Sequence, residues 1–179
     1  MALKVPERLR WAVEVLEVQP DDQIMEIGCG HGVAAALVCE HLTDGRLTAI
    51  DRSAKMIKVA TERNQDCITA GKASFHTVDL NRVDVSQMGA AHFNKIFAVH
   101  VNVFWLKPTN ELDIIRQLLA PDGALYLFYE PFEVRQNQET ADKVIKVLDA
   151  HRFSSRVIFK NPDIERGVCI VAKPADPST

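Results

Sequence analysis

The sequence predicts an α/β fold, a three-layer sandwich in which a mostly parallel seven-stranded sheet lies between helices and ends in an antiparallel C-terminal hairpin. Two observations predict this class. Short strand-like runs alternate with helical patterns, which is typical of a parallel sheet covered by helices on both faces. The last two runs are joined by residues 160–167 alone, a connection too short for a parallel crossover, so they should pair as a hairpin.

The elements follow from hydrophobic spacing. Near the N-terminus, Leu9, Val13 and Leu16 repeat at helical spacing. They predict an amphipathic helix over residues 6–18, which the turn at Pro20 should end. Seven short strand-like runs follow, at 23–27, 47–51, 74–78, 95–99, 124–129, 157–159 and 168–172.

Helical patterns separate these strands. Val33, Leu37 and Val38 predict a helix after the first strand, and Ser53 is a candidate N-cap for the next one. A further helix is expected after Thr109, and the last one over 140–150.

Length and charge restrict the classes of protein. At 179 residues without a low-complexity linker, the chain should be a single domain over 1–179, with its N-terminal helix within 1–20 and a loose tail at 174–179. The net charge of −3 and the lack of a long basic run argue against nucleic acid and anionic membranes as partners. No signal-like or membrane-spanning run is visible, so a cytoplasmic location is expected. The four cysteines have no metal-ligand spacing, so no metal site is expected.

The loop after the first strand carries the strongest functional signal, because glycines stand at positions 28, 30 and 32. Glycine lets the backbone turn sharply and approach a ligand, and the helix that follows offers free N–H groups. A dinucleotide fingerprint would need its third glycine at position 33, where the chain has Val33. The spacing therefore favours another nucleotide-like cofactor.

The pattern Glu26-x-Gly28-x-Gly30-x-Gly32 resembles the first motif of class I S-adenosylmethionine-dependent methyltransferases, in which this loop holds the amino-acid end of the cofactor. Asp51, at the end of the second strand, matches the acidic residue that binds the ribose in this family. The segment 78–80 resembles the adenine-binding segment of the family, whereas Asn94 stands where aspartate is commoner. The resemblance implies S-adenosylmethionine as cofactor, bound by Glu26, Gly28, Cys29, Gly30, Gly32, Asp51, Arg52, Asp79, Leu80 and Val99.

The acceptor side should follow the fourth and fifth strands, because ligands of such sheets bind outside the carboxyl ends of the strands. His100 and Glu130 are the candidate general bases there, although either could merely hold a loop by a hydrogen bond. Methyl transfer needs alignment in a dry site more than it needs a protein nucleophile. The candidate acceptor-binding residues are His100, Asn102, Phe104, Trp105 and Tyr129.

One absence narrows the acceptor. Methyltransferases that act on nucleobase amines resemble one another in an Asp/Asn-Pro-Pro-aromatic turn after the fourth strand, and residues 100–104 do not match it. A small-molecule acceptor is therefore the leading hypothesis. Two alternatives stay open: a cofactor-binding sensor or partner subunit without catalysis, and a nicotinamide-dependent oxidoreductase, which Val33 and the terminal hairpin disfavour. The acceptor atom and the oligomeric state stay open as well.

Overall fold

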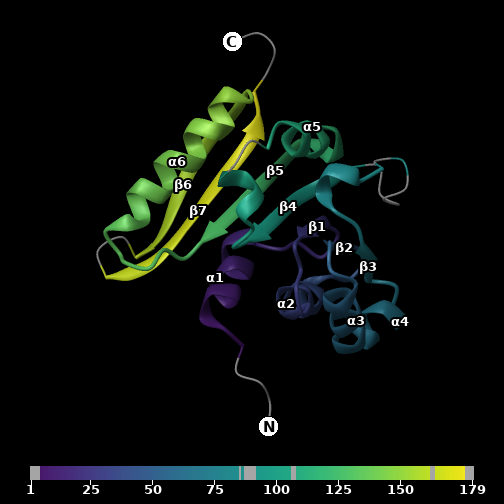
Figure 1. Ribbon diagram of the computed structural model, residues 1–179. Helices are drawn as coiled ribbons and strands as arrows, with labels where there is room; N and C mark the ends of the chain where they lie inside the picture. The colour runs from purple at the N-terminus through teal and green to yellow at the C-terminus, as the bar shows by residue number, and fades with distance from the viewer. Residues whose placement is uncertain (1–4, 85, 87–91, 106–107, 162–163, 176–179) are drawn as a thin grey trace.

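The computed structural model describes residues 5–84, 86, 92–105, 108–161 and 164–175 (Figure 1). A seven-stranded sheet with the order β3-β2-β1-β4-β5-β7-β6 forms the middle layer. β1 to β5 pair in parallel, and β7 pairs antiparallel with both β5 and β6. The predicted fold class is confirmed. The strands are β1 (Gln23–Ile27), β2 (Arg46–Asp51), β3 (Ala73–Thr77), β4 (Phe93–Val99), β5 (Leu119–Tyr129), β6 (Phe153–Asn161) and β7 (Glu165–Pro174).

Helices form the two outer layers, with α5 and α6 on one side of the sheet and α1, α2 and α3 on the other (Figure 1). Short 3₁₀ turns, η1 and η3, follow β3 and β4 and help to shape the carboxyl edge of the sheet. The helical elements are α1 (Glu7–Leu16), α2 (Val33–His41), α3 (Ala54–Arg63), α4 (Gln65–Thr69), η1 (Leu80–Arg82), η3 (Asn102–Trp105), α5 (Thr109–Leu118) and α6 (Gln136–Ala150). None of the described helices is long and apolar enough to cross a bilayer.

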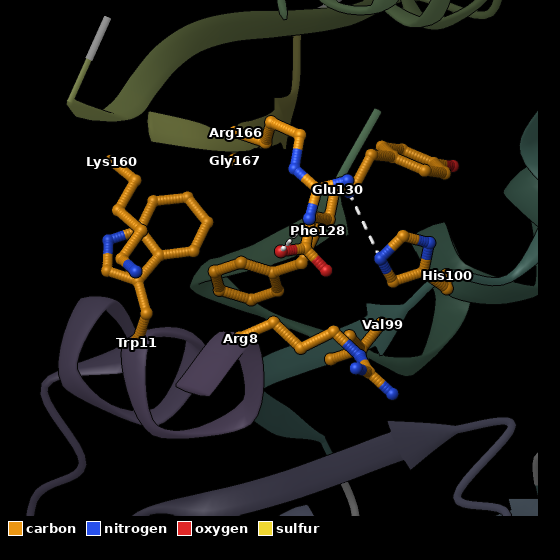
Figure 2. Close-up of a pocket in the computed structure, with 10 residues that line it drawn as sticks. Arg8, Trp11, Val99, His100, Phe128, Glu130, Lys160, Arg166 and Gly167 are labelled. Atoms are coloured by element: carbon orange, nitrogen blue, oxygen red, sulfur yellow. Dashed lines mark hydrogen bonds and ion pairs between the residues drawn. The ribbon is translucent and has the colours of Figure 1, made fainter. Parts of the chain in front are cut away.

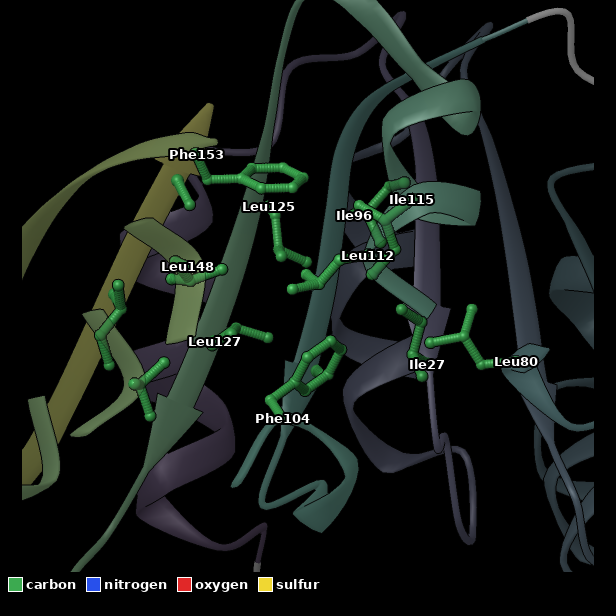
Figure 3. Close-up of a cluster of buried hydrophobic side chains, with 14 of the residues drawn as sticks. Ile27, Leu80, Ile96, Phe104, Leu112, Ile115, Leu125, Leu127, Leu148 and Phe153 are labelled. Atoms are coloured by element: carbon green, nitrogen blue, oxygen red, sulfur yellow. The ribbon is translucent and has the colours of Figure 1, made fainter. Parts of the chain in front are cut away.

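The central strands are buried on both faces, as their apolar runs require. In β1, Ile24 packs into the cluster beneath α1 and α2, whereas Met25 and Ile27 pack into the cluster beneath α5 and α6. Figure 3 shows the second cluster, in which Leu112 of α5 and Leu148 of α6 lie over Leu127 and its neighbours on the sheet. The two cores hold the sheet rigid and set the position of its carboxyl edge.

Several boundaries differ from the prediction for local reasons. α1 stops at Leu16 because Glu17 adopts a left-handed conformation with φ of 47°, and its N–H donates to the Glu14 carbonyl. The last helix starts at Gln136, four residues before the expected position, in a polar stretch that carries no apolar periodicity. α4, η1 and η3 are too short for periodicity to show.

Other details agree with expectation. The Ser53 cap is confirmed, since its Oγ accepts a hydrogen bond of 3.3 Å from the N–H of Met56. Asn94 lies at the entrance of β4, where its Oδ1 accepts a bond of 2.7 Å from the N–H of Gln23. The expected tail begins later than predicted, because β7 runs to Pro174 and the N–H of Ala175 donates to the carbonyl of Arg152. Residues 176–179 of that tail lie outside the described residues.

Candidate active site

Two neighbouring hollows open at the carboxyl edge of the sheet. The first hollow, of about 460 Å³, lies over the ends of β1, β2 and β4, a volume in the usual range for a small ligand. The second hollow is a narrow slot between α1 and the ends of β4, β5 and β7, with free volume of about 10 Å³. His100 lines both hollows.

All three glycines of the loop have positive φ, but only Gly28 lines the first hollow; Gly30 and Gly32, also predicted as cofactor residues, do not. A Cβ on Gly28 would lie 2.7 Å from Cγ2 of Val101, and a Cβ on Gly32 would lie 2.8 Å from Cβ of Ala60. Gly30 differs, because its Cβ would meet no described atom within 4 Å. Gly28 thus lets the loop lie against the segment after β4, whereas Gly32 lets α2 pack against α3.

Asp51 connects this loop to the end of β2 and also lines the first hollow. Its Oδ2 accepts a hydrogen bond of 3.0 Å from the N–H of Gly30, and its Oδ1 accepts one of 2.9 Å from the N–H of Ser53. A carboxylate oxygen has two lone-pair sites, so each oxygen keeps one for a ligand hydroxyl.

Glu26 lies beneath the loop and is only 4% exposed. Its Oε2 is buried and has no hydrogen-bond partner among the described residues. Burial raises the pKa of this carboxyl to about 8, and the nearby Asp51 charge adds to the shift. A buried carboxyl with one unsatisfied oxygen fits a site that receives a cationic or hydrogen-bonding group from a ligand.

The structure places the other predicted cofactor residues in three ways. Arg52, Asp79 and Leu80 line the first hollow together with Gly28. Cys29 is buried in the cluster beneath α3, where burial raises the pKa of its thiol well above the ordinary value. Val99 lines the second hollow and not the first.

His100 stands between the hollows in a left-handed conformation, with φ of 56°. Its backbone N–H donates to the carbonyl of Phe128 at 2.9 Å. Its ring Nε2 accepts a bond of 3.1 Å from the N–H of Glu130 (Figure 2). A nitrogen that accepts from a backbone N–H carries no proton, so the ring is neutral with its proton on Nδ1. Burial lowers the pKa of His100, and the charge of Arg8 lowers it further.

The second hollow is assembled from segments that are far apart in the sequence (Figure 2). Trp11 of α1 meets Phe128 edge to face, with ring centroids 5.6 Å apart. The cationic side chains in its lining, Arg8, Lys160 and Arg166, were not predicted from the sequence, because no local motif links them. The residues that line the slot are Arg8, Trp11, Val99, His100, Phe128, Tyr129, Glu130, Lys160, Arg166 and Gly167.

The predicted acceptor residues separate into different places. Asn102 lines the first hollow, and Tyr129 lines the second. The Tyr129 hydroxyl donates to the carbonyl of Val101 at 3.4 Å, and burial raises its pKa. Phe104 is 1% exposed and belongs to the core under α5 and α6 (Figure 3). Trp105 packs edge to face on Tyr129, and neither it nor Phe104 lines either hollow.

The fold and this edge of the sheet define the class, that of the class I, Rossmann-like, S-adenosylmethionine-dependent methyltransferases. The comparisons with known proteins then identify the family. The profile described as "Methyltransferase domain" matches residues 24–123, more than half of the chain, and the chain belongs to this family.

Three known proteins are similar to this chain in sequence or in fold. YdaC of Bacillus subtilis, an uncharacterized methyltransferase, is 25% identical over 169 residues, which cover 92% of this chain and 90% of YdaC. The uncharacterized protein syc1184_c of Synechococcus is 34% identical over 121 residues, 65% of this chain, but this match spans only 28% of that protein. The crystal structure of magnesium protoporphyrin IX methyltransferase from Synechocystis, with bound SAM, has a similar fold, with a TM-score of 0.65 at 18% identity over 94% of this chain and 76% of that one.

Proposed function

We propose that this protein transfers a methyl group from S-adenosylmethionine, bound in the first hollow, to a small-molecule acceptor bound at the mouth of the second. The single observation that carries the proposal is the position of His100, which lines both hollows at the end of β4. A cofactor in the first hollow and an acceptor at the mouth of the second would meet beside this ring. Transfer requires such a meeting point, because the two reacting atoms must be aligned and close to contact.

The first hollow suits the three parts of the cofactor. Asp51 has lone pairs left for the ribose hydroxyls, and Asp79 with Leu80 lies where the adenine would bind. Glu26 and the glycine loop would bind the amino-acid end of the cofactor. The unsatisfied Oε2 of Glu26 could accept a hydrogen bond from the ammonium group of S-adenosylmethionine. When bound, S-adenosylmethionine supplies a methyl group on a sulfonium, whose carbon–sulfur bond breaks as the acceptor's electron pair forms the new bond.

The residues of this chain would align the two ligands and exclude water from them, rather than transfer a proton. The Nε2 lone pair of His100 is occupied by the N–H of Glu130, so this histidine is a donor through Nδ1 and not a free base. The buried Tyr129 hydroxyl donates its hydrogen bond to the carbonyl of Val101. Glu130 remains as a carboxylate at the slot, with Arg166 at 3.7 Å. We therefore assign His100 and Asn102 to orientation of the ligands.

Calorimetric titration tests the cofactor half of the proposal. S-adenosylmethionine and S-adenosylhomocysteine should bind with a stoichiometry of about one, and NAD should give no heat. Tight NAD binding without a response to the other two would contradict the methyltransferase assignment and favour the oxidoreductase alternative.

A labelling experiment tests the acceptor half. The protein is incubated with methyl-labelled S-adenosylmethionine and separately with the small-molecule, protein and nucleic-acid fractions of a cell extract. We expect label in the small-molecule fraction, because the second hollow is a narrow slot rather than an open surface. Label only in protein or nucleic acid would overturn the small-molecule acceptor. Cofactor binding without label in any fraction would favour the non-catalytic alternative.

A further inference from the structure

Asn64, between α3 and α4, lies against the glycine loop and is only 2% exposed. Its Nδ2 donates a hydrogen bond of 2.9 Å to the carbonyl of Gly32 and one of 2.8 Å to the carbonyl of Ala60. A Cβ on Gly32 would lie 2.6 Å from this nitrogen, so glycine leaves the room that the amide occupies. The side chain thus joins the end of α3 to the start of α2.

These two hydrogen bonds add little to the stability of the fold. The carbonyl of Gly32 already accepts from the N–H of Ala36 at 3.2 Å, and the carbonyl of Ala60 already accepts from the backbone N–H of Asn64 at 3.0 Å. The Oδ1 of Asn64, by contrast, is buried without a hydrogen-bond partner among the described residues. A buried polar atom without a partner costs free energy, and a second bond to a carbonyl that already has one offsets little of this cost. The position of the amide therefore needs a reason other than stability.

The carbonyl that Asn64 holds belongs to the peptide unit between Gly32 and Val33. Because this unit is planar and trans, its carbonyl and the N–H of Val33 point in opposite directions, and fixing one fixes the other. Val33 is the first residue of α2, and the first N–H groups of a helix have no acceptor within it. Asn64 thus sets the direction of a donor that belongs to the glycine loop.

The neighbouring residue holds the preceding part of the loop. Nε of Arg63 donates a hydrogen bond of 2.9 Å to the carbonyl of His31. On the side of the first hollow, Asp51 accepts from the N–H of Gly30 at 3.0 Å. The loop is therefore held from two directions, by Asp51 and by the end of α3. Neither Arg63 nor Asn64 is among the residues that line the first hollow, so their effect on a ligand there passes through the loop.

We propose that Asn64 and Arg63 are positioning residues, which hold the glycine loop in the conformation that binds the amino-acid end of S-adenosylmethionine. This inference rests on the proposed function and assigns to it two residues outside the hollow. Asn64 has the larger part, because a reversed amide would place Oδ1 against two carbonyl oxygens, so its orientation is fixed. Arg63 is exposed, so water competes for its hydrogen bond and its part is smaller.

The test compares S-adenosylhomocysteine, which has the amino-acid end, with 5′-methylthioadenosine, which lacks it. Kd is measured for each ligand and the full chain by calorimetry or by NMR titration. Asn64→Ala should raise the Kd of S-adenosylhomocysteine about tenfold and that of methylthioadenosine less than about twofold, because the loop alone loses a hydrogen bond that positions it. A substitution that merely loosened the fold would weaken both ligands alike.

Arg63→Ala is the second variant, and the fold should tolerate it because this side chain is exposed. It should raise the Kd of S-adenosylhomocysteine about threefold and that of methylthioadenosine less than about twofold. Lys58→Ala is the matched control, because Lys58 is an exposed cation on the same helix and does not line the first hollow. It should leave both Kd values unchanged.

The outcomes separate this inference from the function on which it rests. Failure of S-adenosylhomocysteine to bind the native protein would contradict the proposed function itself. If it binds, but the two variants weaken both ligands alike or leave its Kd unchanged, the positioning role is wrong while methyl transfer stands. Should Asn64→Ala not fold, Arg63→Ala decides by the same comparison.

Discussion

The two hollows at the carboxyl edge of the sheet are built in different ways. Most of the first hollow comes from short segments directly after β1, β2, β3 and β4, so each residue lies close to the strand that positions it. The second hollow draws on α1, on the ends of β4 and β5, and on the β6–β7 hairpin, from Arg8 to Gly167. Under the proposed function, the cofactor site is thus built from local segments of the sequence, whereas the acceptor site depends on how distant elements pack.

The largest effect should come from Glu26, beneath the first hollow. Its carboxyl has an ordinary pKa of 4.5 when unfolded and about 8 when folded, so the unfolded chain binds fewer protons between these values. The free energy of unfolding should therefore fall as pH rises from about 4.5 to about 8, by several kcal/mol. Glu26→Gln should remove this part of the slope in urea unfolding at several pH values. An unchanged slope in the variant would show that another group causes it.

The affinity for the cofactor should rise with pH, whereas the free energy of unfolding falls. If Glu26 ionises to receive the ammonium group, the affinity for S-adenosylhomocysteine rises as pH increases toward about 8, and binding releases a proton. Calorimetry in buffers of different ionisation enthalpy measures this proton. Glu26→Gln should release none, and equal release from both proteins would contradict the assignment.

The glycine loop allows a matched comparison within the first hollow. Gly32→Ala should lower the free energy of unfolding by about 3 kcal/mol, because a left-handed residue would also press on Ala60. Gly30→Ala imposes the backbone cost alone, about 1 kcal/mol, since its Cβ meets open space. Equal losses in urea unfolding would mean that the contact between α2 and α3 relaxes freely.

Asp51→Ala should weaken S-adenosylhomocysteine binding on the order of 100-fold, because the ribose loses a charged acceptor and the loop loses its bonds from Gly30 and Ser53. Asp21→Ala, in an exposed turn, is the control and should leave the affinity unchanged. The measurement is calorimetry. An affinity within about threefold of the native protein would place the ribose elsewhere.

The smallest effect should come from His100, at the border between the hollows. In protein labelled with ¹⁵N-histidine, NMR should show the neutral Nδ1–H form at pH 7, and protonation should occur below the ordinary pKa of 6.5. Detection of the Nε2–H form would contradict the contact with Glu130. His100→Phe assigns the signal and should change S-adenosylhomocysteine affinity by less than about threefold, because the ring only borders the first hollow.

Within the core, strand positions were largely predictable, because short apolar runs such as 168–172 are typical of a strand buried on both faces. Element ends were less predictable. α1 ends before Glu17 because this residue has a left-handed backbone conformation, which its residue type does not predict. α6 begins earlier than expected, in a stretch without apolar spacing.

By itself, the sequence determined the fold class and the likeness of the glycine loop to a methyl-donor site, because β1, the loop and Asp51 are encoded as strand–turn units at fixed spacing. Only the tertiary structure decided which nitrogen of His100 is occupied, that Phe104 is core, and that Arg8 reaches the slot. These facts depend on how elements far apart in the sequence pack, since the residues that line the slot come from positions as distant as Arg8 and Gly167.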